Sequence, residues 1–206
     1  MSVVRRALIG PLVLILFSQA AAAQDPRLAA RLDKPTLGSV RAIVDSARVA
    51  GLPTAPLVDK ALEGSAKGSD GGNITSAVHQ LYLRMGSAKR AIGPTATADE
   101  IKSASDALDA GVSARDLARL RSASGKRPLT MPLAVLSDLI GRKVPVATAT
   151  DLVIQLAKSG LNDPEFALFQ RNVRADIDRG ADPTVAATTR ARGLVLRTGS
   201  ETKPAE

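Results

Sequence analysis

Apolar residues recur at spacings of three and four along most of this chain, with polar residues between them. In the clearest run, residues 74–92, Ile74, Val78, Leu81 and Met85 share one stripe of a helix of about five turns. No stretch alternates convincingly between apolar and polar residues at a period of two. The pattern therefore predicts an all-α protein of about nine short-to-medium helices and no sheet.

The turns between the predicted helices resemble one another. Residues 51–53 (Gly-Leu-Pro) place a glycine just past a helix end, an apolar residue that packs back on that helix, and a proline at the next helix start. Variants of this turn occur at 111–113, 143–145 and 180–183. The spacing of the later turns suits a helix-pair repeat, so we expect stacked helical hairpins, solenoid-like or in an irregular bundle. A closed globular bundle is the alternative.

Several helix starts are marked by residues that can accept a hydrogen bond from the first turn. Thr97 with Glu100 matches a capping box, and Asn162 begins a cap–acid–proline–acid start. Ser113 is a further predicted cap, and so are Asn73 and Thr130. The glycine-rich residues 64–73 are interpreted as a flexible connector.

The N-terminus has the layout of a secretory signal peptide. Arg5 and Arg6 precede an apolar run, and residues 21–23 are alanines suited to cleavage near Ala23. An uncleaved membrane anchor is the alternative. The chain then divides into a signal peptide (1–23), a polar lead-in (24–35), one all-helical domain (36–193) with possible degenerate helix-pair repeats, and a disordered tail (194–206). We expect export to the periplasm or extracellular space, with no transmembrane segment after signal removal.

Composition excludes some chemistry and disfavours more. The 206 residues contain no cysteine, so disulfides, thiolate metal sites and a cysteine nucleophile are excluded. Only Tyr82, Phe166 and Phe169 remain as aromatic residues after residue 23, which disfavours sites built on aromatic stacking. Removing 23 residues, which include two arginines and no acids, lowers the net charge from +8 to +6.

No residue pattern assembles a reactive site. His79 is the single histidine, and it points about 140° from the apolar stripe of its helix, as a surface residue would. Asp176 and Asp178 are two residues apart and diverge around a helix, whereas Asp138 and Arg142 have the spacing of a surface ion pair. We therefore expect no catalytic residue, no cofactor and no metal.

The clearest charge feature is residues 111–145, which carry seven basic and two acidic side chains. Arg115 and Arg119 share the helix face opposite Leu117 and Leu120, and Lys126 and Arg127 follow in a turn. A solvated face that maintains solubility is the simpler interpretation of such a region. As a site, it favours an acidic partner, anionic lipid or an acidic envelope polymer. Nucleic acid is not expected as a target of an exported protein.

The sequence thus favours an exported, non-catalytic helical binding or scaffold protein of the cell envelope. It would contact a partner protein or an anionic envelope component through Arg115, Arg119, Lys126 and Arg127. Two alternatives remain: an envelope-associated hydrolase whose site is not evident from the sequence, and a purely structural or assembly-assisting protein.

Overall fold

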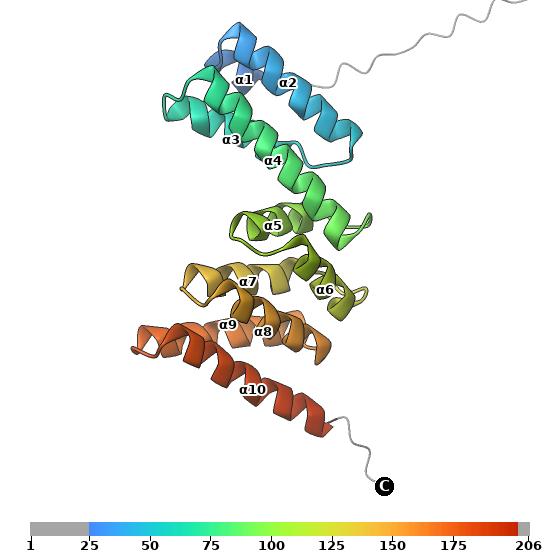
Figure 1. Ribbon diagram of the computed structural model, residues 1–206, viewed down its shortest axis with the longest axis vertical. Helices are drawn as coiled ribbons and strands as arrows, with labels where there is room; N and C mark the ends of the chain where they lie inside the picture. The colour runs from blue at the N-terminus through green and yellow to red at the C-terminus, as the bar shows by residue number, and fades with distance from the viewer. Residues whose placement is uncertain (1–24, 202–206) are drawn as a thin grey trace, which may run out of the picture.

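The computed structural model describes residues 25–201, with side chains through residue 197, and all regular structure in that range is α-helical. Ten helices follow one another along an elongated molecule, with α1 near one end and α10 at the other (Figure 1). They are α1 (Pro26–Arg31), α2 (Lys34–Val49), α3 (Ala55–Ala66), α4 (Gly71–Ile92), α5 (Ala98–Asp109), α6 (Ala114–Ser124), α7 (Thr130–Gly141), α8 (Val146–Lys158), α9 (Asp163–Asp178) and α10 (Pro183–Glu201). The all-α prediction is confirmed. The helix beyond the expected nine is α1, which lies in the segment expected to be a polar lead-in.

The last six helices stack in two rows. Helices α5, α7 and α9 contact one another in that order, and α6, α8 and α10 do the same (Figure 1). The first row begins its helices at residues 98, 130 and 163, which are 32 and 33 residues apart. Each helix pair buries its apolar side against the next pair, which is how helical solenoids are built. The predicted stack of helices is therefore what the structure contains.

Helix α4 joins the N-terminal helices to the six-helix stack. It is 22 residues long and packs against α2 and α3 on one side and against α5 and α6 on the other. Most of the stripe predicted for it is buried: Ile74, Val78, Met85 and Ile92 are each at most 5 % exposed, and Leu81 is partly buried. Because α4 faces both groups of helices, a single apolar core runs through the described chain from Leu28 to Leu194.

The turn that recurs in the sequence recurs in the structure. After α2, Gly51 has φ of 63°, and the amide of Leu52 donates to the carbonyl oxygen of Ala47 at 2.8 Å. The amides of Val112 and Val144 make the corresponding bond after α5 and α7, each at 3.0 Å. These apolar residues are buried, so each turn fixes the helix end and adds a side chain to the core.

Helix starts were predicted with mixed success. The capping boxes of Thr97 and Asn162 are present, and Ser113 caps α6. The predictions for Asn73 and Thr130 are wrong. Asp70 caps α4 by accepting from the amide of Asn73, and α7 begins after Leu129 with no side-chain cap.

The glycine-rich stretch 64–73 is shorter as a connector than expected, because α3 continues to Ala66 and α4 begins at Gly71. Gly71 lies directly against α2. A Cβ atom at Gly71 would be 1.9 Å from the Oγ1 atom of Thr36, a buried residue. That glycine therefore serves close helix packing, which a sequence pattern of loop residues does not distinguish from flexibility.

Helix α10 ends later than expected. We predicted an end near Arg192, but the helix continues to Glu201, and Leu194 within the predicted tail is buried in the core. The predicted signal peptide (1–23) and the last five residues of the predicted tail lie outside the described residues. No helix in the described part of the chain is both long enough and apolar enough to cross a membrane.

Candidate functional site

The four predicted contact residues, Arg115, Arg119, Lys126 and Arg127, lie on α6 and in the turn between α6 and α7, and we call them the basic surface. Arg115 and Arg119 are exposed, whereas Leu117 and Leu120 on the opposite face of α6 are buried. The helix face predicted from the sequence is thus the solvent-facing one. The four side chains nevertheless differ in what they contact.

Arg119 links two helices of the same row. Its guanidinium donates to Asp116 of α6 at 2.8 Å and to Asp151 of α8 at 3.3 Å. Hydrogen bonds from the Ser113 hydroxyl and from Arg119 hold the pKa of the Asp116 carboxyl below its usual value. Arg119 is therefore held in place by carboxylates on two helices.

Arg127 is half-buried and serves as a cap for two helix ends. Its guanidinium donates to the carbonyl oxygens of Ala157 at 2.5 Å and Leu161 at 2.8 Å, at the end of α8. It also donates to the carbonyl oxygen of Ser124 at 3.1 Å, at the end of α6. Carbonyl groups in the last turn of a helix lack intrahelical partners and carry partial negative charge, so a cation there is stabilising. Arg127 holds the α6–α7 turn against α8.

Glu100 fixes the other side of that turn. It is 4 % exposed, and its Oε1 atom accepts from the amide of Leu129 at 2.6 Å, while Oε2 accepts from the amide of Thr97 at 2.9 Å. Burial raises the pKa of the Glu100 carboxyl, but the hydrogen bonds from Leu129 and Thr97 outweigh burial and leave that pKa below its ordinary value. The residues preceding α7 are therefore anchored to α5 by an ionised carboxylate.

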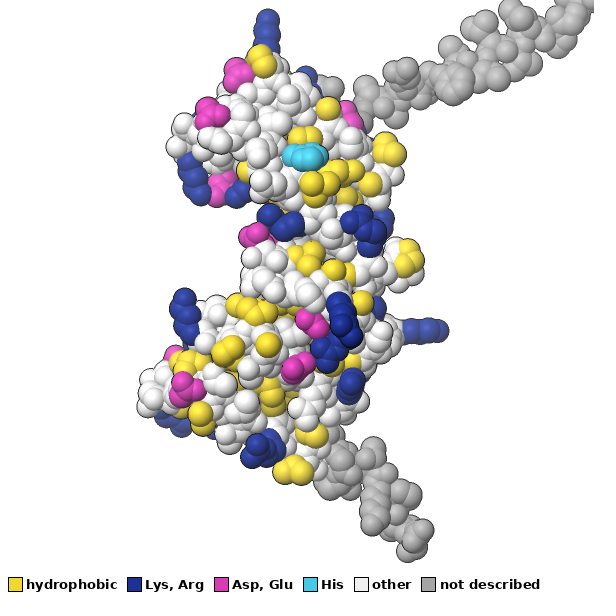
Figure 2. All heavy atoms as spheres, in the orientation of Figure 1, with side chains coloured by type: hydrophobic (Ala, Val, Ile, Leu, Met, Phe, Trp, Pro, Cys, Tyr) yellow, Lys and Arg dark blue, Asp and Glu magenta, His cyan; other side chains and the backbone are white. Residues whose placement is uncertain are grey.

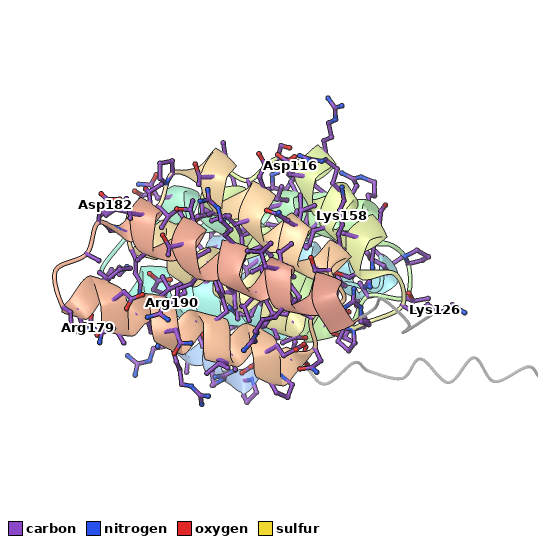
Figure 3. All side chains as sticks on the ribbon, turned by 90° about the horizontal axis from the view of Figure 1, so that it is seen from below. Asp116, Lys126, Lys158, Arg179, Asp182 and Arg190 are labelled. Atoms are coloured by element: carbon purple, nitrogen blue, oxygen red, sulfur yellow. The ribbon has the colours of Figure 1, made fainter. Side chains whose placement is uncertain are left out.

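Lys126 and Arg115 are the parts of the basic surface that remain available. Both are exposed, and neither side chain makes a hydrogen bond or ion pair in the described chain, although the charge of Arg115 helps to lower the pKa of the Asp116 carboxyl. Figure 3 shows Lys126 extending past the helix ends, on the side of the molecule opposite to Arg179 and Asp182 in the α9–α10 turn. The basic surface thus consists of two arginines that hydrogen bonds hold in place, Arg119 and Arg127, and two exposed side chains that make no such bond, Arg115 and Lys126.

A groove that sequence reasoning missed lies where α3, α4 and α5 meet. It has a volume of about 680 Å³, and the outline of the molecule is indented there, with acidic and basic side chains on both sides (Figure 2). Its apolar lining includes Pro56, Leu81 and Met85. Ser105 of α5 also lines it, is 1 % exposed, and has a hydroxyl with no hydrogen-bond partner.

The charged lining of the groove is net acidic. Five carboxylates and three basic side chains line it: Asp59, Glu63, Asp99, Asp106, Asp109, Lys60, Arg84 and Lys102. Lys60 pairs with Glu63 at 3.0 Å and Lys102 with Asp106 at 2.9 Å. The Nε atom of Arg84 is buried and has no hydrogen-bond partner. The sequence signal for Ser105 was its place on the inner stripe of α5, between Ile101 and Leu108, four and three residues away.

The remaining candidate residues have structural surroundings. His79 is exposed, with its ring centroid 6.1 Å from that of Tyr82, and no group of acids and histidine in the described residues is placed to hold a metal ion. Asp138 and Arg142 form the predicted ion pair at 3.3 Å, and Arg174 of α9 joins them at 2.5 Å.

Asp176 and Asp178 diverge as predicted. Asp176 binds Arg190 of α10, labelled in Figure 3, at 2.6 Å and Arg179 at 2.5 Å, whereas Asp178 lies 3.6 Å from Arg142. The two carboxylates therefore stabilise different helix contacts and do not act as a pair.

Comparison with known proteins finds no matching family model, no matching curated protein and no matching solved structure.

Proposed function

We propose that this protein is an exported helical binding or scaffold protein of the cell envelope, and that its basic surface contacts an anionic envelope component. The observation that supports this most directly is that the four side chains of the basic surface differ in their contacts. Arg119 and Arg127 are fixed by contacts with α6 and α8, whereas the side chains of Arg115 and Lys126 are exposed and make no hydrogen bond or ion pair in the described chain. Because the backbone that carries these two side chains is already fixed, binding phosphate or carboxylate groups orders only the side chains, at about 0.5–1.5 kcal/mol each.

The proposal is tested by the binding of the purified protein to vesicles of phosphatidylcholine with and without phosphatidylglycerol. We expect binding to the anionic vesicles that falls as salt increases, because exposed charges are screened over about 10 Å at 0.1 M salt. The double variant Arg115→Ala and Lys126→Ala should bind about 30-fold more weakly, since each basic residue near an anionic surface contributes about 1 kcal/mol.

The matched control is Lys34→Ala with Arg171→Ala, which removes the same charge from exposed positions on α2 and α9. If both double variants lose the same affinity, net charge alone explains binding and the basic surface has no special role. If neither vesicle type binds, the anionic-lipid form of the proposal is wrong. Cross-linking in the envelope then tests for a partner protein.

A further inference from the structure

We propose that the groove between α3, α4 and α5 binds an extended segment of a partner protein that carries an arginine or lysine. This site is separate from the basic surface and does not depend on it. Its lining carries five acidic and three basic side chains, a net charge of −2, in a chain whose net charge is +8. A cationic side chain is therefore attracted to this groove although the protein as a whole repels it.

One carboxylate of the groove, Asp99, is unpaired, and a second, Asp59, is held only by a long ion pair. The Asp99 side chain makes no hydrogen bond or ion pair in the described chain, whereas Asp59 pairs with Arg27 at 3.7 Å, beyond hydrogen-bond distance. The other acids of the groove are occupied by Lys60, Lys102 and Arg84. An incoming cation thus finds one unpaired acid, Asp99, and a second, Asp59, whose ion pair with Arg27 is long and exposed.

Two buried polar groups indicate that the ligand also carries hydrogen-bond acceptors. Ser105 and Arg84 both line the groove, and the Ser105 hydroxyl and the Arg84 Nε–H are buried there without a partner. A buried donor without an acceptor is destabilising, and for the two donors beside this groove a bound ligand could supply the acceptor. The carbonyl oxygens of a peptide main chain are suitable acceptors for both.

The chemistry of the groove distinguishes a peptide from simpler cations. No set of acids and histidine in residues 25–197 converges as metal ligands do, which argues against a divalent cation. A polyamine supplies positive charge but no carbonyl group for Arg84. An extended peptide supplies a carbonyl on every residue, a cationic side chain, and apolar side chains that suit Pro56, Leu81 and Met85.

The test uses the ¹⁵N-labelled protein and the probe acetyl-Leu-Arg-Leu-amide, followed by amide chemical shifts. We expect saturable shifts in α3, α4 and α5. Ser105→Ala should weaken binding by about twofold to tenfold, the equivalent of one hydrogen bond. Asp99→Asn should weaken it by about twofold to fivefold, the equivalent of one exposed ion pair.

Each variant has a matched control. Ser124→Ala removes another buried serine hydroxyl without a partner, at the end of α6, and Asp163→Asn removes another exposed first-turn acid, in α9. Both should leave binding unchanged. The melting temperature of Ser105→Ala should not fall, because the removed hydroxyl makes no bond in the free protein.

Three results would overturn the inference. Shifts confined to other helices, or none, would show that the groove does not bind a peptide. Equal binding of acetyl-Leu-norleucine-Leu-amide would show that the cation is irrelevant. Equal binding of spermidine at the same amides would show that charge alone is recognised and that Ser105 and Arg84 do not select a main chain.

Discussion

Lys143 has a left-handed backbone conformation that glycine adopts at the corresponding positions of two other turns in the stack. Its φ is 72°, and the same position after α5 and α9 is held by Gly111 and Gly180, both with φ of 95°. A side chain in the left-handed region costs about 1–2 kcal/mol, whereas a glycine loses about 0.5–1 kcal/mol through the extra entropy of the unfolded chain. Lys143 is exposed and forms no ion pair in the described chain. We therefore expect Lys143→Gly to raise the free energy of unfolding by about 0.5–1 kcal/mol.

The reverse substitution provides the matched test. At Gly180, an added Cβ atom would meet no heavy atom within 4 Å, so Gly180→Lys changes the backbone preference without a steric clash. We expect Gly180→Lys to lower the free energy of unfolding by about the amount that Lys143→Gly raises it, about 0.5–1 kcal/mol.

Urea unfolding followed by far-UV circular dichroism measures both changes. The dependence of the free energy on urea should be the same in both variants, because neither alters the surface that unfolding exposes. In thermal unfolding, each kcal/mol corresponds to about 2–4 °C in a domain of this size. A loss of stability in Lys143→Gly, or none in Gly180→Lys, would refute the assignment of strain to this turn position.

Two further predictions concern the contacts between helices. Arg127→Ala should lower the free energy of unfolding by about 2–4 kcal/mol, because charge-assisted hydrogen bonds to half-buried carbonyl groups are lost. Arg119→Ala should change the free energy of unfolding little, because its ion pairs are exposed. Equal effects of the two variants in urea unfolding would contradict this difference. Hydrogen bonds from Arg190, and then from Arg179, lower the pKa of the Asp176 carboxyl from 3.8 to about 2. The contribution of the ionised Asp176 carboxylate to stability is thus complete above pH 3.8 and is lost as the pH falls through about 2. In acid unfolding, an Asp176→Asn variant should therefore lose less stability than the wild type between pH 3.8 and about pH 2.

Local features of the fold were predictable because their causes lie within a few residues. The turn at Gly51 and Leu52 depends on a glycine and the apolar residue after it, and the capping box of Thr97 and Glu100 spans four positions. The failures came where two local solutions compete. Asn73 and Asp70 can both cap α4, and Asp70 does so because the helix includes Gly71, which packs against α2.

The candidate sites depended more on contacts that are distant in sequence. The exposed face of α6 follows from periodicity, but the role of Arg127 does not. Its acceptors on Ala157 and Leu161 lie 30 and 34 residues away. The groove likewise combines α3, α4 and α5, and Ser105 becomes a groove residue only when those helices meet. Periodicity places a residue on a face but does not state what that face contacts.

The two-row stack also governs how the molecule opens. The principal contacts of α9 and α10 are with each other and with α7 and α8, so none of them reaches α3, α4 or α5. In a linear array of this kind, stability is the sum of local units and their nearest-neighbour interfaces, and the end units unfold first. Amide hydrogens of α10 should accordingly exchange through partial openings that leave the groove intact, while those of α4, which contacts four helices, require opening of both halves. The unfolding of the N-terminal helices and the unfolding of the six-helix stack are therefore coupled mainly through α4, which packs against both.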